Sequence, residues 1–317
     1  AIAKWFKGKE MAMAMGLEMS IARLGVFAAM WLSPMVSDKF NASVSAPVAF
    51  GAVLLMIGLI FYFIFVLMDR KFDKQLEAAG ELTEEASEEE FKFSDLGKIF
   101  TSKMFWLVAL LCVLYYSAIF PFQKFAANML QSNLGISATA ASDIFRWFPI
   151  GAAFITPFLG WFLDRKGKGA TMLILGSLLM IICHTTFALV LPAAPSKVIA
   201  FSAIVLLGIS FSLVPAALWP SIPKIMDKRY LGSAYSLIFW VQNFGLSGTP
   251  IMIGYALEKT NPGVAEQIAA GVEGATYNYT VPMLLFASLG VLALLFALWL
   301  KADDARNHYG LEQPNIK

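Results

Sequence analysis

Charged residues are scarce in this sequence. Only 15% of its 317 residues are Asp, Glu, Lys or Arg, whereas about 25% is usual for a soluble globular protein. This scarcity excludes a soluble enzyme and an intrinsically disordered chain. It also excludes a nucleic-acid-binding protein, so we expect no nucleic acid among the partners. The formal net charge of +2 says little by itself, and the placement of the charges must carry the argument.

Cysteine and histidine are almost absent. The chain has two of each. Cys112 and Cys183 both lie within apolar runs, so we expect neither a disulfide framework nor a metal cluster. Two histidines and two cysteines so placed cannot build a zinc site. The HExxH, GxSxG and Walker-loop patterns are missing from the sequence as well. We therefore expect no enzyme activity, no cofactor and no bound metal.

Apolar residues, in contrast, make up 58% of the chain, and the mean hydropathy is +0.68. A membrane-spanning helix needs about 20 mostly apolar residues. Eight segments reach that length: 11–36, 47–68, 104–131, 139–163, 170–192, 197–223, 231–256 and 279–301. Because lipid offers the backbone no hydrogen bonds, each segment should be a helix. The predicted fold is an all-α, polytopic membrane bundle in contact with the lipid bilayer.

Prolines inside these spans predict kinks rather than helix ends. They are Pro34, Pro121, Pro149, Pro157, Pro215, Pro220 and Pro250.

The positions of Lys and Arg predict the orientation of the spans. If both termini lie on one side, eighteen of these residues fall on that side and three on the other. Short loops rich in Lys and Arg stay in the cytoplasm. We therefore expect the N-terminal stub, the segment 69–103 and the C-terminus to be cytoplasmic.

The segment 69–103 is long and polar, with seven glutamates between Glu77 and Glu90. Two spans precede it and six follow it. Many secondary transporters pair two similar halves around a site at the midplane of the membrane. We therefore divide the chain into the end of an N-terminal six-helix half (1–68), an acidic cytoplasmic linker (69–103), a C-terminal six-helix half (104–301) and a cytoplasmic tail (302–317). On this interpretation the chain is N-terminally truncated and lacks four spans. A genuine eight-span protein is the alternative.

The loop between the fourth and fifth spans carries a motif. Gly160, Asp164, Arg165, Gly167 and Lys168 fit the pattern GxxxD[RK]xG[RK]. The glycines permit a tight turn, and Asp164 can accept hydrogen bonds from a helix N-terminus or a basic group. The motif resembles the loop that recurs between helices 2–3 and 8–9 of the major facilitator superfamily, which numbers the spans here 5 to 12. The resemblance implies a latch that holds the two halves in the outward-open state. A charged turn that only enforces topology is the other interpretation.

Further motifs resemble one branch of this superfamily, which contains a lysosomal dipeptide uniporter. The motifs are WFKGKE at 5–10, MSIARLG at 19–25, YYSAIFPF at 115–122, ALWP at 217–220, LGSAY at 231–235 and VQNFG at 241–245. The resemblance implies a secondary transporter that moves dipeptides or other short peptides by alternating access. A single-span accessory subunit is implied if the protein is eukaryotic. We favour the cell membrane as its location, with the lysosomal membrane as the alternative.

Arg23 is the foremost candidate for a binding residue. It lies about 13 residues into its span, which places it near the midplane. An ionisable residue at that depth is costly and is by default functional, and a guanidinium suits bidentate binding of a carboxylate. In the branch that the sequence resembles, the matching arginine binds the carboxylate of the substrate. The alternative is an ion pair with Glu18, which lies five residues back and is poorly placed.

Four uncharged residues are further candidates to line the cavity: Tyr116, Trp219, Gln242 and Asn243. Trp219 could instead belong to a belt at the lipid interface, and the two amides could simply join helices. Asp143 and Arg146 share a helix face. They predict either a gate at the outer mouth or a plain ion pair at the rim. For His184, helix packing and proton carriage are the two alternatives.

Three functions follow from these observations. The first is a facilitator of dipeptides, in which Arg23 holds the carboxyl end. The acidic partner of the peptide's amine would then lie in the missing helices. The second is a proton-coupled carrier of organic anions or other solutes that uses the same arginine. The third is a non-transporting receptor or scaffold, in which the acidic linker would make the interaction.

Overall fold

A computed structural model describes residues 5–6, 10–41, 45–78, 93–227 and 230–316. Every regular element in these ranges is helical. The chain divides into two compact units. Unit 1 comprises 1–23 and 93–317, and unit 2 comprises 24–92. The boundary falls inside the helix α2 (Met11–Lys39), so Arg23 belongs to unit 1.

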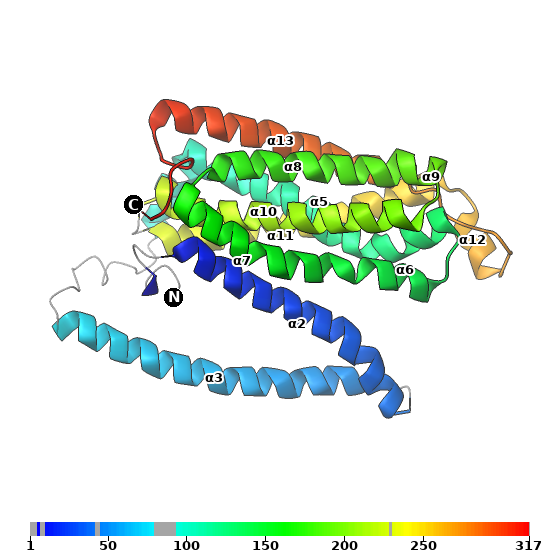
Figure 1. Ribbon diagram of the computed structural model, residues 1–317, viewed down its shortest axis with the longest axis horizontal. Coiled ribbons are helices and arrows are strands. Elements are labelled where there is room, and N and C mark those ends of the chain that lie inside the picture. Colours follow the sequence, from blue (N-terminus) through cyan, green and yellow to red (C-terminus); the bar gives the residue numbers. More distant parts are fainter. Residues whose placement is uncertain (1–4, 7–9, 42–44, 79–92, 228–229, 317) are drawn as a thin grey trace. The chain divides into compact units, whose positions relative to one another are not determined.

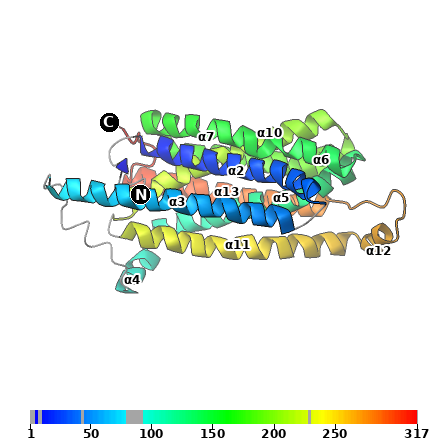
Figure 2. The same cartoon turned by 90° about the horizontal axis from the view of Figure 1, so that it is seen from below.

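Unit 1 is a bundle of long helices. Its longest members are α5 (Lys103–Leu134), α10 (Lys197–Ile225), α11 (Leu231–Thr260) and α13 (Thr280–Asn307). The shorter ones are α4 (Phe93–Thr101), α6 (Ala138–Phe145), α7 (Trp147–Lys166), α8 (Gly169–Thr185), α9 (Leu191–Ala193) and α12 (Val264–Ala269). A π-helical turn, η2 (Thr186–Val190), joins α8 to α9. The short α12 lies at the end of the unit opposite to the Asn307 end of α13 (Figures 1 and 2).

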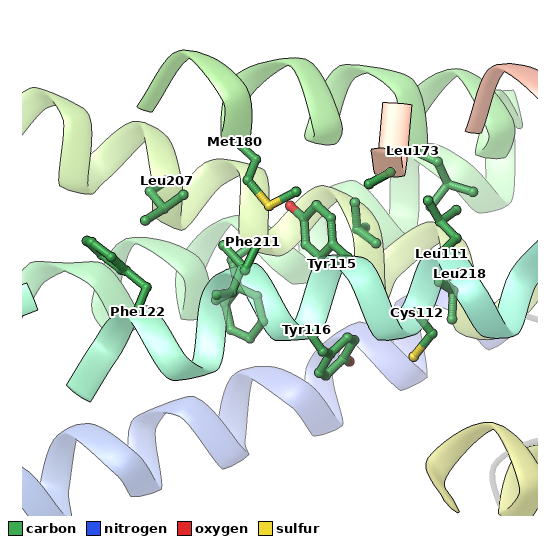
Figure 3. Close-up of a cluster of buried hydrophobic side chains, with 14 of the residues drawn as sticks. Leu111, Cys112, Tyr115, Tyr116, Phe122, Leu173, Met180, Leu207, Phe211 and Leu218 are labelled. Atoms are coloured by element: carbon green, nitrogen blue, oxygen red, sulfur yellow. The ribbon is translucent and has the colours of Figure 1, made fainter. Parts of the chain in front are cut away.

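Helix α5 lies at the centre of this unit and packs against α11, α13 and α10. Its apolar side chains meet those of α8 and α10 in one cluster, in which Leu111, Phe122, Met180 and Leu207 are fully buried (Figure 3). Ser102 begins α5 by accepting a hydrogen bond from the amide of Phe105, 3.3 Å away. Because lipid tails are as apolar as these side chains, close van der Waals packing rather than removal of apolar area from water stabilises this cluster.

Six helical segments are long and apolar enough to cross a membrane. They are Ala12–Ser37, Ser45–Gln75, Lys103–Leu134, Gly169–Ala193, Lys197–Ile225 and Thr280–Asn307. This confirms the predicted all-α membrane bundle. The other two predicted spans are also helical, although they are not among the six. One of them, 231–256, is part of the 30-residue helix α11, which is about 45 Å long.

The remaining span, 139–163, is not one helix. It is divided at Arg146, between α6 and α7. Pro149 follows three residues later and has no amide hydrogen to donate to the carbonyl of Phe145, where α6 ends. The other prolines behave differently: Pro121, Pro157, Pro215, Pro220 and Pro250 lie inside continuous helices.

Unit 2 contains the second part of α2 and the helix α3 (Ser45–Ala78). The stretch Val53–Met68 of α3 is apolar on all sides, and within this unit Leu55 and Phe61 are exposed. A helix that is apolar all round is typical of a membrane span. The predicted linker 69–103 is helical at both ends, because α3 continues to Ala78 and α4 begins at Phe93. Its part 79–92, with most of the acidic run, lies outside the described residues.

Candidate functional site

Arg23 lies on a narrow face of α2 that packs against α7. The face consists of Ala12, Gly16, Ser20 and Arg23, which are all buried. Glycine allows the two helices to approach closely. A β-carbon on Gly16 would lie 2.9 Å from the carbonyl oxygen of Thr156, and one on Gly160 would lie 2.4 Å from that of Ala12. The packing of α2 on α7 therefore brings the arginine against the inner side of the bundle.

Four neutral acceptors hold the guanidinium of Arg23. Its Nη1 donates to the carbonyl oxygen of Ala152 at 2.9 Å, to the hydroxyl of Ser212 at 3.2 Å and to the hydroxyl of Thr156. Its Nη2 donates to the carbonyl oxygen of Phe211 at 2.9 Å. The ring of Phe211 lies 4.2 Å from the guanidinium carbon, in a cation–π contact. Helices α7 and α10 thus provide every one of these contacts.

The charge of Arg23 has no carboxylate partner among the described residues. Glu18 is exposed and is not among the acceptors, which disfavours the alternative of a local ion pair. Arg23 itself is only 7% exposed. A buried charge is costly unless an opposite charge or a full set of hydrogen bonds compensates it. At Arg23 only neutral groups compensate the charge. The site can therefore accept an anionic group.

Tyr116 and Trp219 lie beside this arginine. The indole nitrogen of Trp219 donates to the hydroxyl of Tyr116 at 3.1 Å. The centre of the Tyr116 ring lies 6.4 Å from that of Phe211, edge to face, so a chain of aromatic rings leads from the arginine to the tryptophan. Figure 3 shows Tyr115 and Tyr116 on opposite sides of α5. The structure therefore brings together Arg23, Tyr116 and Trp219, from α2, α5 and α10.

Gln242 and Asn243 are adjacent on α11 but lie in different environments. Gln242 is buried, and its side-chain oxygen accepts a hydrogen bond from the thiol of Cys112 on α5, with 3.4 Å between the two atoms. Asn243 is exposed and donates to the carbonyl oxygen of Phe239, one turn earlier, at 2.8 Å. Phe239 stacks on Trp219 with 4.7 Å between ring centres. Asn243 thus borders the aromatic group, whereas Gln242 joins α11 to α5.

The loop motif forms a second site at the start of α2, the end of the bundle predicted to be cytoplasmic. Asp164 is fully buried. Its two carboxylate oxygens accept hydrogen bonds from the amides of Ala12 at 3.1 Å and Met13 at 2.8 Å. The first amides of a helix have no partner within the helix and carry a partial positive charge. Asp164 therefore caps α2 and ties its first turn to α7.

The other motif residues surround Asp164. Gly167 has a φ of +71°, a conformation that favours glycine. Arg165 is exposed, and its guanidinium carbon lies 5.0 Å from the centre of the Trp161 ring. Lys168 also adopts a positive φ and forms an ion pair with Glu312 at 3.8 Å. The motif thus has an inner part that binds α2 and an outer part that carries positive charge.

Asp143 and Arg146 form an ion pair three residues apart, at the junction of α6 and α7. Both side chains are about half exposed (51% and 48%). Such pairs contribute little to stability. This geometry favours a rim ion pair over a gate.

Two groups of residues at these sites are not predicted from the sequence. The first comprises Thr156 and Ser212, which hold Arg23. Both are polar residues within apolar spans, where hydroxyls often bond across helices, and that signal could have identified them. The second is the chain after α13. Its Asn315 donates a hydrogen bond to Asp164 at 2.7 Å, and no local pattern in the sequence indicates this contact.

Two comparisons with known proteins found matches. A family model of the Major Facilitator Superfamily matches residues 1–250 and, in a second match, residues 122–315. The relatives include proteins named lysosomal dipeptide transporter MFSD1. The protein of Bos taurus is 32% identical over 264 residues, which are 80% of this chain and 53% of the relative. That of Homo sapiens is 30% identical over 262 residues, which are 80% of this chain and 54% of the relative.

The protein of Mus musculus is 31% identical over 262 residues, with the same two shares of 80% and 54%. The chain thus spans about half the length of the curated relatives that it matches.

Proposed function

Since the chain belongs to the Major Facilitator Superfamily, we propose that it is part of a multi-pass membrane transporter rather than an enzyme. This transporter carries dipeptides or other short peptides across the membrane by alternating access. The observation that carries the proposal is Arg23. It is a buried cation on α2 whose partners are all neutral. The names of the relatives, at about 30% identity, suggest the same substrate class.

The chemistry of the arginine favours a carboxylate. A guanidinium offers two parallel N–H bonds to a carboxylate, and such charge-assisted bonds are about twice as strong as neutral ones. The two hydroxyl acceptors also have other partners. The hydroxyl of Thr156 donates to the carbonyl oxygen of Ala152 at 2.7 Å, and that of Ser212 donates to the carbonyl oxygen of Gly208 at 2.9 Å. Both hydroxyls therefore keep a partner when a substrate displaces them from Arg23.

The rest of the proposed site receives the body of the peptide. Tyr116 and Trp219 supply an aromatic wall next to the arginine, and Asn243 lies at its edge beside Phe239. Gln242 contributes through the packing of α11 on α5. The amine of the peptide requires an acidic partner, which we place in that half of the relatives' length that this chain does not span.

The loop motif is proposed to act as the latch of the transport cycle. Asp164 ties the first turn of α2 to α7, and we assign this contact to the state that is closed on the cytoplasmic side. In this assignment residues 1–68 end one six-helix half and 104–301 form the other. The termini are cytoplasmic, and the cell membrane or the lysosomal membrane contains the protein. A single-span accessory subunit is part of the proposal only if the protein is eukaryotic.

The test is transport by the full-length protein in liposomes. We expect Arg23→Ala to reduce the uptake of a labelled dipeptide by roughly a hundredfold, since a charge-assisted pair is worth about 1.5–3 kcal/mol. The matched control is Arg146→Ala, which removes an exposed arginine and should leave uptake within about twofold. Unchanged uptake in Arg23→Ala would refute the site. Uptake of sugars but not of peptides would refute the substrate class.

Two alternatives are outcomes of the same assay. Loss of uptake after the pH gradient is collapsed would indicate a proton-coupled carrier of organic anions, because a uniporter follows only the gradient of its substrate. If deletion of 77–90 abolishes the cellular function while uptake is absent from the wild-type protein, the receptor or scaffold interpretation is correct.

A further inference from the structure

The segment after α13 folds back onto the loop motif. Helix α13 ends at His308, which has a φ of +55°, and the chain then returns to the end of the bundle where α7 ends and α8 begins (Figure 1). Leu311 is almost fully buried there, and its amide donates to the carboxylate of Asp304 at 3.0 Å. We name residues 310–316 the returning segment.

Main-chain hydrogen bonds join the returning segment to the motif. The amide of Lys168 donates to the carbonyl oxygen of Glu312, and that of Gly169 donates to the carbonyl oxygen of Leu311, both at 3.0 Å. The contact is so close that a β-carbon on Gly167 would lie 2.3 Å from the carbonyl oxygen of Glu312. The glycine of the motif therefore serves two purposes: it turns the loop, and it leaves room for this segment.

Polar side chains fix the segment on both sides. The carboxylate of Glu312 accepts hydrogen bonds from the amide and the hydroxyl of Thr171, at 2.7 and 2.8 Å. It also lies 3.8 Å from the ammonium groups of Lys168 and Lys301. On the other side, the ammonium group of Lys224 donates to the carbonyl oxygens of Gly310 and Gln313 at 3.0 and 2.9 Å. Three helices and one loop thus hold a segment of seven residues.

The segment ends on Asp164. The side-chain amide of Asn315 donates to one carboxylate oxygen at 2.7 Å, and this same oxygen accepts the bond from the amide of Ala12. The main-chain amides of Asn315 and Ile316 both donate to the carbonyl oxygen of Asp164 at 3.0 Å. One buried residue therefore connects α2, α7 and the returning segment.

We propose that Asn315 is a positioning residue for Asp164, and that the returning segment stabilises the closed arrangement of α2 on α7. Asn315 fixes the rotation of the carboxylate so that its oxygens face the amides of Ala12 and Met13. The segment also covers Asp164, and a hydrogen bond is stronger where water cannot compete for it. Release of the segment then weakens the closure and favours opening at this end. The inference rests on the proposed function only in that opening and closing belong to the transport cycle.

The test measures the opening directly. Spin labels are attached to the full-length protein at Leu17→Cys on α2 and Phe158→Cys on α7, which are both exposed positions, in a background without other reactive cysteines. Distances between the labels are then measured without substrate. We expect Asn315→Ala, and separately deletion of 311–317, to raise the ratio of the long-distance to the short-distance population by at least about tenfold, because a hydrogen bond to a charged group is lost. Asn307→Ala, at an exposed asparagine at the end of α13, is the matched control and should show the wild-type distribution.

Glu312→Gln provides a second, milder variant. It retains the shape of the side chain but loses the attraction to Lys168 and Lys301, so the same population should rise by a smaller factor. Equal distance distributions in Asn315→Ala, Glu312→Gln and Asn307→Ala would overturn the inference. This outcome is distinct from failure of the proposed function. The distances need no substrate, whereas the assignment of Arg23 depends on uptake alone.

Discussion

Two buried charges on the α2–α7 contact, Arg23 and Asp164, have opposite signs and opposite environments. Asp164 is complemented by the amides of Ala12 and Met13 at the start of α2, and by Asn315. Arg23 contacts carbonyl and hydroxyl oxygens and the ring of Phe211, all of them neutral. A helix N-terminus carries roughly half a positive charge. The anion is therefore compensated by the fold, while the cation is solvated by neutral groups, of which the two hydroxyls have other partners as well.

This difference indicates which charge is structural and which is available to a ligand. Removal of the carboxylate would leave the amides of α2 and Asn315 without their acceptor. Removal of the guanidinium would leave both of its hydroxyl partners bonded to carbonyl oxygens of their own helices. A buried charge whose hydroxyl partners remain satisfied without it is a candidate for substrate binding. A buried charge on which its neighbours depend for hydrogen bonds belongs to the structural framework, which includes the helices that move.

The largest expected effect is on transport. Arg23→Met should reduce dipeptide uptake roughly a hundredfold while leaving the thermal midpoint of the purified protein unchanged or higher, because an apolar side chain can replace a buried charge without loss of stability. Uptake in liposomes and a thermal unfolding scan in detergent measure the two quantities. A drop in the midpoint by many degrees would show that Arg23 is structural, and the contrast with Asp164 would then be lost.

The second effect is on stability. Asp164→Leu should lower the free energy of unfolding by about 3 kcal/mol, since it leaves several buried amides unpaired. The control is Asp143→Leu, which breaks an exposed ion pair and should change stability by less than about 0.5 kcal/mol. Chemical denaturation monitored by tryptophan fluorescence compares them. Equal stabilities of the two variants would contradict the structural role of Asp164.

The third effect tests the close approach of the two helices. Gly160→Ala places a β-carbon 2.4 Å from the carbonyl oxygen of Ala12, and we expect a loss of about 1–3 kcal/mol from overpacking. Gly151 lies on the same helix, and a β-carbon there meets no atom within 4 Å. Gly151→Ala should therefore be neutral or stabilising by up to about 1 kcal/mol. The same denaturation measurement should separate the two glycines, and similar losses at both would argue against the contact.

The smallest effect concerns the acceptors of Arg23. If the hydroxyl of Thr156 accepts a hydrogen bond from the guanidinium until substrate arrives, Thr156→Val should tighten dipeptide binding by about threefold, because one competing acceptor is lost. Thr156→Ser retains the hydroxyl and should bind as the wild type does. Equilibrium binding of a labelled dipeptide provides the comparison. Weaker binding by Thr156→Val would mean that the hydroxyl contacts the substrate instead.

The sequence predicted the features that depend on local pattern. Apolar runs predicted the helices, and the depth of Arg23 within its run singled it out. The motif predicted a carboxylate at a helix N-terminus, which is where Asp164 lies. The break at Arg146 is also local, because Pro149 removes one helical hydrogen bond, but the sequence pattern predicts a kink there and the structure has two helices.

Contacts between distant parts of the chain could not be predicted in this way. The acceptors Thr156 and Ser212 lie more than a hundred residues from Arg23, and Asn315 lies 151 residues from Asp164. The different environments of Gln242 and Asn243 follow from the rotation between adjacent helical residues, whose absolute direction only the packing of α11 determines. The periodicity of apolar residues predicts which face of a helix is buried, but not which other helix that face contacts.

The central claim is that the charge of Arg23 is reserved for the carboxylate of a substrate. Binding of a dipeptide and of the same dipeptide with an amidated C-terminus to the full-length protein tests it most directly, in the wild type and in Arg23→Met. We predict that amidation weakens binding to the wild type by roughly a hundredfold and to the variant hardly at all, because the carboxylate and the guanidinium form one charge-assisted pair. An amidation penalty of equal size in both proteins would contradict the account.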